Sequence, residues 1–392
     1  METFYRTHWY LVEHTNAPVR RSLMDEIDWS DRLIGIKGTR GVGKTTFLLQ
    51  YAKEKFGKDR SCLYINMNNF YFSQYSLVDF ASTFVNQGGR VLLIDQVFKY
   101  PEWSHDLRVC YDKFPTLKII FTGSSVMRLK EENPELNSIV KVYYLRGFSF
   151  REFLNLQSEN NFRVYNLHEI LNNHEDIAKS ILSKCNPLDY FQDYIHHGFY
   201  PFFLEKRNFS ENLLKTMNMM VEVDILLIKQ IELKYLSKIK KLLYLLAVDG
   251  PVAPNVSQLA VDIQTSRATV MNYIKYLADA RLINMVYPYG EEFPKKPSKI
   301  IMHNTNLMYS IYPAKVEEQD LLDTFFMNTL YKDHKLYKGE KGTTFRVDKD
   351  YNFKICTQES KLKNNPNVYY AMHNIKCGHD KIIPLWLFGL LY

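Results

Sequence analysis

Eight consecutive residues, Gly38-Thr39-Arg40-Gly41-Val42-Gly43-Lys44-Thr45, satisfy the pattern G-x-x-x-x-G-K-[ST] in full. Glycines at this spacing let backbone N–H groups surround a phosphate, and a helix that follows presents its positive end to the same anion. The lysine reaches the β- and γ-phosphates, and the next hydroxyl ligates Mg²⁺. The spacing therefore predicts a site for a nucleoside triphosphate with Mg²⁺, with Thr45 as a metal ligand, formed by Gly38, Arg40, Gly41, Val42, Gly43, Lys44, Thr45 and Thr46.

A second metal-side group should be an acid at the end of a buried strand, and Asp95 directly follows the apolar run Val91–Ile94. In P-loop ATPases of the additional-strand class the next residue is usually a glutamate that polarises the attacking water, and here it is Gln96. A neutral amide can orient water but cannot take its proton. We therefore expect nucleotide binding with slow hydrolysis. Ser124 or Ser125, after another buried run, is expected to contact the γ-phosphate.

The first 155 residues alternate short apolar runs with amphipathic stretches, which is typical of an α/β domain with a mostly parallel sheet. Continuous apolar runs indicate central strands that are covered on both faces. The expected strands are 33–37, 62–66, 91–95, 117–122 and 141–145, and the expected helices are 44–56 and 77–85. The aromatic side chains Tyr64, Phe70, Tyr71 and Phe72 are expected to be packing residues.

The rest of the chain predicts three further domains, a helical one over 156–236, a second over 237–300 and a third over 301–392. In the second, helices 241–248, 256–263 and 268–280 precede a strand over 281–289, the outline of a winged helix-turn-helix. The third mixes short strands and helices and ends in an apolar segment that we expect to be buried.

Composition narrows the class of protein. The 392 residues exceed the size at which single domains usually stop growing, about 250–300 residues. With 46% hydrophobic and 24% charged residues, disordered and fibrous classes are excluded. The five cysteines are scattered without a CxxC pair, which favours a reducing cytoplasm. We expect no membrane span, because the apolar runs fall short of about 20 residues.

Several segments together resemble a known family, the bacterial and archaeal AAA-like P-loop ATPases that carry a winged helix and a C-terminal PD-(D/E)xK nuclease-like domain. The resemblance runs from Arg6 to Tyr392. It is carried by LMDEIDWSDRLIGIKGTRGVGKTT, VLLIDQVFKYPEW, FTGSS, GFSFREFL, HNTNLMYSIY and IPLWLFGLLY. It implies ATP binding, a helical lid after Phe150 and a degenerate restriction-nuclease-like domain over 301–392.

The chain departs from the family at its charged positions. Two adjacent arginines of the family align with Ser138 and Ile139. Arg128, Arg146 or Arg151 could compensate for them, although a structural role at a helix surface is expected for each. In the last domain the metal-binding Asp and Glu become Thr344 and Lys354, and the Lys becomes Gln358. Asp323 stands where a helix-borne Glu is usual. One acid cannot hold the metal in that arrangement, so we expect a nuclease-shaped and inert domain.

Contact with DNA is left open by the sequence. Residues 238–299 hold nine Lys/Arg and five Asp/Glu, a net +4 of the chain's +7. The segment 266–281 would suit a major-groove helix through Arg267, Asn272 and Lys275. A lid or a protein-interaction module fits the same weakly basic helix.

Two functions follow from these residues. The first is an ATP·Mg²⁺-binding switch in which Asp95, Gln96 and Ser124 support only slow hydrolysis. The alternative is an active ATPase coupled to nucleic-acid handling, with Gln96 merely slowing turnover. An active nuclease is disfavoured because its metal-binding acids are missing. The sequence does not indicate an oligomeric state.

Overall fold

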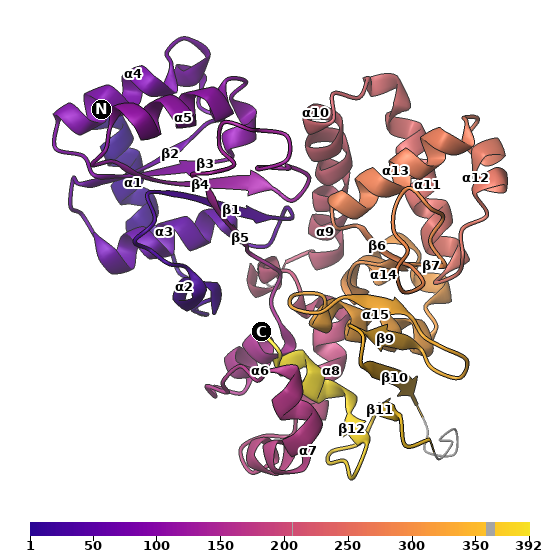
Figure 1. The fold of residues 1–392 in the computed structure, drawn as a ribbon. Coiled ribbons are helices and arrows are strands. Elements are labelled where there is room, and N and C mark those ends of the chain that lie inside the picture. The colour runs from indigo at the N-terminus through magenta and orange to yellow at the C-terminus, as the bar shows by residue number, and fades with distance from the viewer. Residues whose placement is uncertain (206, 358–364) are drawn as a thin grey trace. The chain divides into compact units, whose positions relative to one another are not determined.

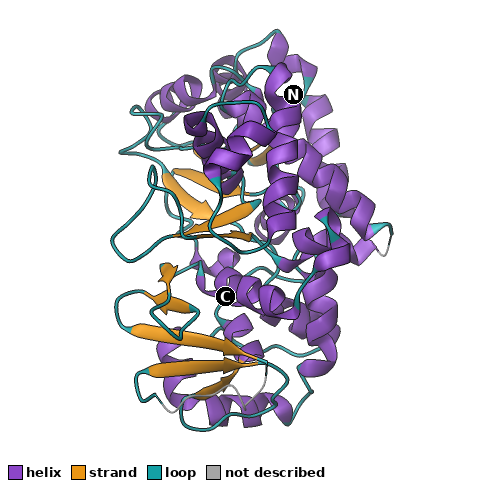
Figure 2. Ribbon diagram, turned by 90° about the vertical axis from the view of Figure 1, so that its right-hand side faces the viewer, coloured by secondary structure: helices purple, strands orange, loops and turns teal. Residues whose placement is uncertain are grey.

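The chain forms two compact units, Met1–Arg146 and Gly147–Tyr392. The computed structural model describes residues 1–205, 207–357 and 365–392. Each unit has a sheet and helices of its own (Figure 1, Figure 2). The finer division predicted from the sequence, at 155, 236 and 300, stays a prediction.

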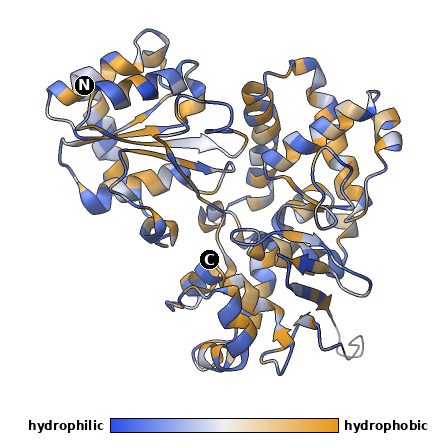
Figure 3. Cartoon of the chain, viewed as in Figure 1, coloured by the Kyte–Doolittle hydropathy of each residue, from blue (hydrophilic) through white to orange (hydrophobic). Residues whose placement is uncertain are grey.

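The first unit contains a five-stranded, all-parallel sheet in the order β2-β3-β4-β1-β5. All five strands occur where the sequence predicts them. Hydrophobic stretches of this sheet alternate with paler and hydrophilic ones (Figure 3), and β5 is only partly buried. β4 lies between β1 and β3, so the sheet has the additional strand expected. The strands are β1 (Leu33–Gly38), β2 (Cys62–Asn66), β3 (Val91–Asp95), β4 (Lys118–Ser124) and β5 (Lys141–Tyr144).

Helices cover both faces of this sheet, with α4 and α5 on one face and α3 on the other (Figure 1). α1 packs against α3 and β2. Parallel strands buried in this way keep both faces out of water, which accounts for the continuous apolar runs of β1 and β3. The helices are α1 (Glu2–His14), α2 (Leu23–Glu26), α3 (Lys44–Lys55), α4 (Leu77–Asn86) and α5 (Trp103–Lys113), with the 3₁₀ turns η1 (Phe70–Ser73) and η2 (Val97–Lys99).

The second unit begins with helices. Complete capping boxes start two of them, because Ser149 pairs with Glu152 and Asn166 pairs with Glu169. The helices are α6 (Phe150–Gln157), α7 (Leu167–Leu182), α8 (Leu188–Asp193), α9 (Phe209–Met219), α10 (Leu226–Ile228), α11 (Leu236–Asp249), α12 (Val256–Asp262) and α13 (Arg267–Asp279). Shorter helical turns are η3 (Tyr194–Gly198), η4 (Pro201–Glu205), η5 (Met220–Ile225) and η6 (Leu233–Tyr235).

A two-stranded antiparallel sheet, β6 (Ile283–Val286) with β7 (Lys299–Met302), follows the three helices α11, α12 and α13. Ser266 caps α13 by accepting a hydrogen bond from the Thr269 backbone N–H. Val270, Ile274 and Leu277 are buried on one side of that helix. Its opposite side carries the polar residues of the segment 266–281.

The second unit ends in a five-stranded sheet of mixed direction, in the order β12-β11-β10-β9-β8. β10, β11 and β12 are parallel, and β8, β9 and β10 are antiparallel. Its elements are α14 (Thr305–Ile311), η7 (Pro313–Lys315), α15 (Glu318–Leu330), β8 (Leu336–Lys338), β9 (Phe345–Val347), β10 (Tyr351–Cys356), β11 (Val368–Met372), β12 (Ile382–Pro384) and η9 (Leu385–Leu390).

One hydrophobic core joins the start of this unit to its end. Phe150 of α6 and Ile170 of α7 share it with Phe326 of α15 and Trp386 of η9. The apolar C-terminal segment is buried from Leu385 to Tyr392, as predicted. None of the helices in the described part of the chain combines the length and the apolar character needed to cross a membrane.

Candidate nucleotide site

The loop between β1 and α3 has the backbone geometry that its glycines predict. Gly41 and Gly43 adopt φ of +86° and +91°, values that side chains with a Cβ rarely tolerate. A Cβ at Gly38 would lie 2.4 Å from the Leu145 carbonyl oxygen, so only glycine fits there. α3 begins at Lys44, directly after Gly43, and its N-terminal end therefore opens into the loop.

Lys44 closes over this loop. Its Nζ donates hydrogen bonds of 2.8 Å each to the carbonyl oxygens of Gly38 and Thr39. Val42 is fully buried. Among the other predicted residues, Arg40 is half-buried and Thr46 is exposed on the first turn of α3. The predicted phosphate-binding residues thus lie together around one loop.

Asp95 lies beside the same loop and is 1% exposed. Thr45 Oγ1 donates a 2.7 Å hydrogen bond to Asp95 Oδ2. A hydroxyl and a carboxylate side by side are the protein ligands that Mg²⁺ accepts when it also binds nucleotide phosphates. The residues present therefore fit an ATP-bound Mg²⁺, with Thr45 and Asp95 holding the metal.

Two further donors around Asp95 come from β2 and were not identified from the sequence. Tyr64 donates its hydroxyl to Asp95 Oδ2 at 2.9 Å, and Asn66 Nδ2 lies 3.5 Å from the same oxygen. Burial, and next the Asp95 charge, raises the pKa of Tyr64, so this hydroxyl stays a donor. β2 pairs with β3 and places Asn66 opposite Asp95. The sequence signal for this contact was the presence of a tyrosine and an asparagine in an otherwise apolar strand.

Gln96 occupies a left-handed backbone conformation, with φ 54° and ψ 48°. Its backbone N–H donates to Asp95 Oδ1 at 3.1 Å and to Thr122 Oγ1 at 2.9 Å. Thr122 in turn donates its hydroxyl to Asp95 Oδ1. These hydrogen bonds fix the backbone of Gln96, which occupies the position of the usual catalytic glutamate and carries an amide side chain.

Ser124 is the last residue of β4 and pairs with Gly38, the first glycine of the loop. Its Oγ accepts a 3.4 Å hydrogen bond from the Val126 N–H. The Ser125 hydroxyl is buried, and no hydrogen-bond partner for it appears within the described residues. An unsatisfied buried hydroxyl is costly, which makes Ser125 as good a candidate as Ser124 for a phosphate contact.

Arg21 also belongs to this region and was not singled out in the sequence. Its guanidinium is buried and donates to two backbone carbonyls, that of Val42 at 3.1 Å and that of Arg146 at 2.7 Å. The Arg21 side chain therefore ties the phosphate loop to the last residue of the first unit.

Two expectations about individual side chains need correction. Phe70 was expected to pack, yet it is 91% exposed in η1, because the turn after β2 projects it outward. The structural role expected for Arg151 was at a helix surface, but its guanidinium is buried and donates to the Tyr392 carbonyl at 3.0 Å. Arg128 stays at the surface, 3.9 Å from Glu132.

Comparisons with known proteins match two different parts of the chain to two different families. Residues 30–154 match the family described as an AAA domain. Residues 188–320 match a domain of unknown function, DUF8612. The uncharacterized protein MJ1637 of Methanocaldococcus jannaschii is 30% identical over 275 residues. That match covers 66% of this chain and spans 57% of the length of the curated relative.

Similar solved structures include a RuvB variant from Thermotoga maritima, 15% identical, which covers 73% of this chain and 89% of its own at a TM-score of 0.28. The ORC1 protein of Aeropyrum pernix in complex with DNA is 12% identical and covers 80% and 92% at 0.31. Such scores are too low to establish a shared arrangement. The family match and the loop geometry agree, and the region of residues 30–154 is an AAA-type P-loop domain.

Proposed function

We propose that this protein is a nucleotide switch that binds ATP·Mg²⁺ in its first unit and hydrolyses it slowly. The observation that carries the proposal is the 2.7 Å hydrogen bond between Thr45 and Asp95 beside the glycine loop. The residue directly after Asp95 is Gln96, where an acid is usual. ATP supplies a γ-phosphate whose presence or loss can order or release neighbouring segments.

The protein's own residues account for binding better than for turnover. Lys44 and the backbone N–H groups of the loop neutralise phosphate charge, and Asp95 with Thr45 holds the metal. Gln96 can orient a water molecule but cannot accept its proton. An ATP-bound form would therefore be long-lived, and Arg21 provides a physical connection from the loop to Arg146 at the end of the unit.

Single-turnover hydrolysis with Mg²⁺ tests this proposal. We expect tight ATP binding, a turnover well below ~1 s⁻¹, the low end for phosphoryl-transfer enzymes, and a faster rate in Gln96→Glu. The carboxylate supplies the missing base at the same fixed backbone position. Lys44→Ala should lose ATP binding, and Gln96→Ala should reduce the residual rate further.

A natural protein that already turns over at ~1 s⁻¹ or faster would overturn the switch proposal. The alternative, an active ATPase coupled to nucleic-acid handling, would then hold, with its catalytic base elsewhere. A rate that Gln96→Glu leaves unchanged would show that a missing proton acceptor is not the limit.

DNA contact through a winged helix is a second part of the proposal. A shallow groove of about 410 Å³ lies beside the N-terminal half of α13. Arg267 and Asn272 line it from α13, and Lys296 lines it from the loop between β6 and β7. These three side chains are exposed, and cations there could contact phosphates while Asn272 reaches a base edge.

Ion pairs limit the basic surface of this region. Lys240 pairs with Glu222, Lys275 with Asp279 and Lys299 with Asp323. No ion-pair partner of Arg267 or Lys296 appears in the part of the chain that the structure describes. Arg267 and Lys296 thus bring two cations to the groove that no ion pair within the described residues neutralises.

Fluorescence anisotropy with a labelled DNA duplex tests the contact. We expect Arg267→Glu and Lys296→Glu each to weaken binding several-fold and to lower the salt dependence by about one phosphate contact. Lys376→Glu is the matched control, because it makes the same charge change at an exposed site outside the groove. Equal losses in all three variants would mean that only net charge matters and would overturn DNA contact through this groove. No binding of the duplex at all would favour the interaction module.

We also propose that residues 301–392 form a nuclease-like domain without nuclease activity. Thr344, directly before β9, lies beside Lys354 of β10, and the family has its two metal-binding acids at these positions. Asp323 is buried on α15 and is already engaged by Lys299 at 2.7 Å and Gln319 at 2.8 Å. Gln358 lies outside the described residues. Within those residues, no group of three or more His, Cys, Asp or Glu could hold a metal ion.

A further inference from the structure

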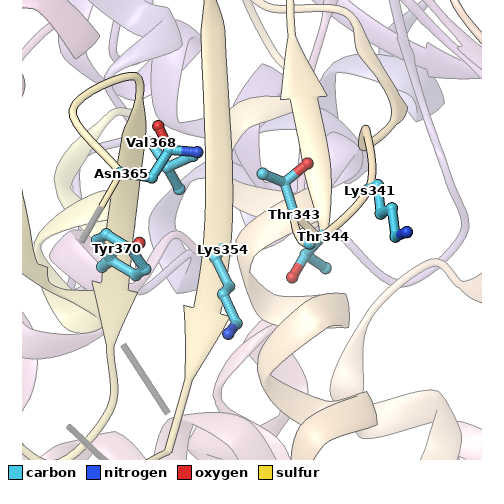
Figure 4. A pocket seen from close by; sticks show the side chains of 8 residues that line it. Lys341, Thr343, Thr344, Lys354, Asn365, Val368 and Tyr370 are labelled. Carbon is cyan, nitrogen blue, oxygen red and sulfur yellow. The ribbon is translucent and has the colours of Figure 1, made fainter. Parts of the chain in front are cut away.

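A pocket of about 560 Å³ opens on one face of the C-terminal sheet (Figure 4). The turn between β8 and β9 forms one wall, and β10 and β11 form the other. It is lined by Lys341, Gly342, Thr343, Thr344, Lys354, Asn365, Val368 and Tyr370. Its volume falls within the range of small-ligand sites.

Strand register holds the centre of this pocket in place. The Thr344 N–H donates to the Phe353 carbonyl at 2.7 Å, and the Ile355 N–H donates to Thr344 Oγ1 at 3.1 Å. These bonds place Thr344 beside Lys354, which pairs with Tyr370 on β11. Three polar side chains therefore form a row, with Thr344 directly before β9, Lys354 on β10 and Tyr370 on β11.

The other face of the same strands is buried. Phe353 and Ile355, which flank Lys354, belong to the main core of the unit. Side chains alternate between the faces of a strand, so the Lys354 side chain is directed away from that core and into the pocket. Figure 4 shows Lys354 and Thr344 extending from neighbouring strands into the same space. A site on paired strands is more rigid than one on loops alone.

The lining has the chemistry of an anion receptor. It offers two ammonium groups, the hydroxyls of Thr343, Thr344 and Tyr370, and the amide of Asn365, and none of the described residues that line it is an Asp or Glu. A divalent cation requires carboxylate oxygens and is repelled by ammonium groups. Charged donors bind phosphate oxygens strongly.

We propose that this pocket binds a phosphate group without a divalent metal. The ligand is a phosphate oxyanion, from a free polyphosphate or from a nucleic-acid backbone, and Lys341 and Lys354 neutralise its charge. The hydroxyls of Thr344 and Tyr370 donate to its oxygens. The proposal does not depend on nucleotide binding in the first unit or on DNA contact at α13.

The test uses the full chain carrying Lys44→Ala, so that the phosphate loop does not contribute. Calorimetry in EDTA measures the binding of pyrophosphate, and anisotropy in EDTA measures the binding of a labelled oligothymidylate. Lys341→Glu and Lys354→Glu place a carboxylate in the pocket. Lys349→Glu is the matched control, since it makes the same change at an exposed position of the neighbouring turn.

We expect each pocket variant to weaken pyrophosphate binding at least about tenfold, the effect of losing one charged hydrogen bond, with Lys349→Glu within about twofold of the parent. A parallel loss of oligothymidylate binding would assign the ligand to a nucleic-acid backbone, and loss of pyrophosphate alone would assign it to a free polyphosphate.

Failure of the Lys44→Ala chain to bind either anion in EDTA would overturn the proposal. An equal loss of pyrophosphate affinity in Lys349→Glu would also overturn it, as would an affinity that Lys341→Glu leaves unchanged. Lys341 lies in an exposed turn, so its variant should fold even where Lys354→Glu disturbs the strand. Thermal unfolding of each variant shows whether Lys354→Glu has destabilised the fold.

Discussion

At the scale of single residues, two buried hydrogen bonds connect Asp95 through Tyr64 to His8 of α1. Tyr64 donates its hydroxyl to Asp95, and the backbone N–H of Tyr64 donates to His8 Nδ1 at 3.1 Å. His8 lies on α1 and is fully buried. Its ring must be neutral to accept this bond at Nδ1.

This contact makes the stability of the first unit depend on pH. Burial lowers the pKa of His8 to about 4, whereas an unfolded histidine titrates near 6.5. Between these values the unfolded chain binds a proton that the folded chain does not. The free energy of unfolding should therefore fall by about 3 kcal/mol as pH drops from about 6.5 to about 4. Urea unfolding, followed by hydrogen exchange of peptides from residues 1–146, measures this slope.

Two variants separate His8 from the other histidines. His8→Gln should flatten the pH dependence of unfolding, although it lowers stability at neutral pH. His14→Gln should leave the slope unchanged, because His14 is exposed on the same helix. A slope that persists in His8→Gln would assign the effect to another group.

At the scale of elements, the sequence was most informative where one physical requirement dominates. Continuous apolar runs predicted the central strands β1 and β3, because a strand buried on both faces tolerates little else. β5 was also predicted, although it is only partly buried at the edge of the sheet. The glycine spacing predicted the phosphate loop, because only glycine adopts the φ of Gly41 and Gly43 without strain.

Contacts that depend on the order of strands were harder to predict. Tyr64 and Asn66 meet Asp95 only because β2 pairs with β3, and an apolar run does not specify its partner. Arg21 binds carbonyls that lie 21 and 125 residues away in sequence. Hydrophobicity alone also misjudged Phe70, which the turn after β2 exposes. These features follow from tertiary structure, which local patterns do not encode.

At the scale of the whole molecule, the second unit is held together by a core shared between its two ends. Trp386, in the C-terminal segment, is 1% exposed and packs in one core with Phe150 of α6 and Phe326 of α15. Its indole N–H donates to the Ile375 carbonyl at 3.2 Å. The segment after β12 is thus as integral to this unit as the helices that open it.

Trp386→Ala should therefore destabilise the second unit and spare the first. Replacing a buried tryptophan with alanine typically costs about 3–5 kcal/mol, because it leaves a cavity. We expect lost hydrogen-exchange protection from α6 through η9, with ATP affinity and the protection of β1–β4 retained. Leu233→Ala, at a site that is 73% exposed, should change neither. If ATP affinity and the protection of both units fell together, the two units would unfold as one cooperative structure, and the prediction would be wrong.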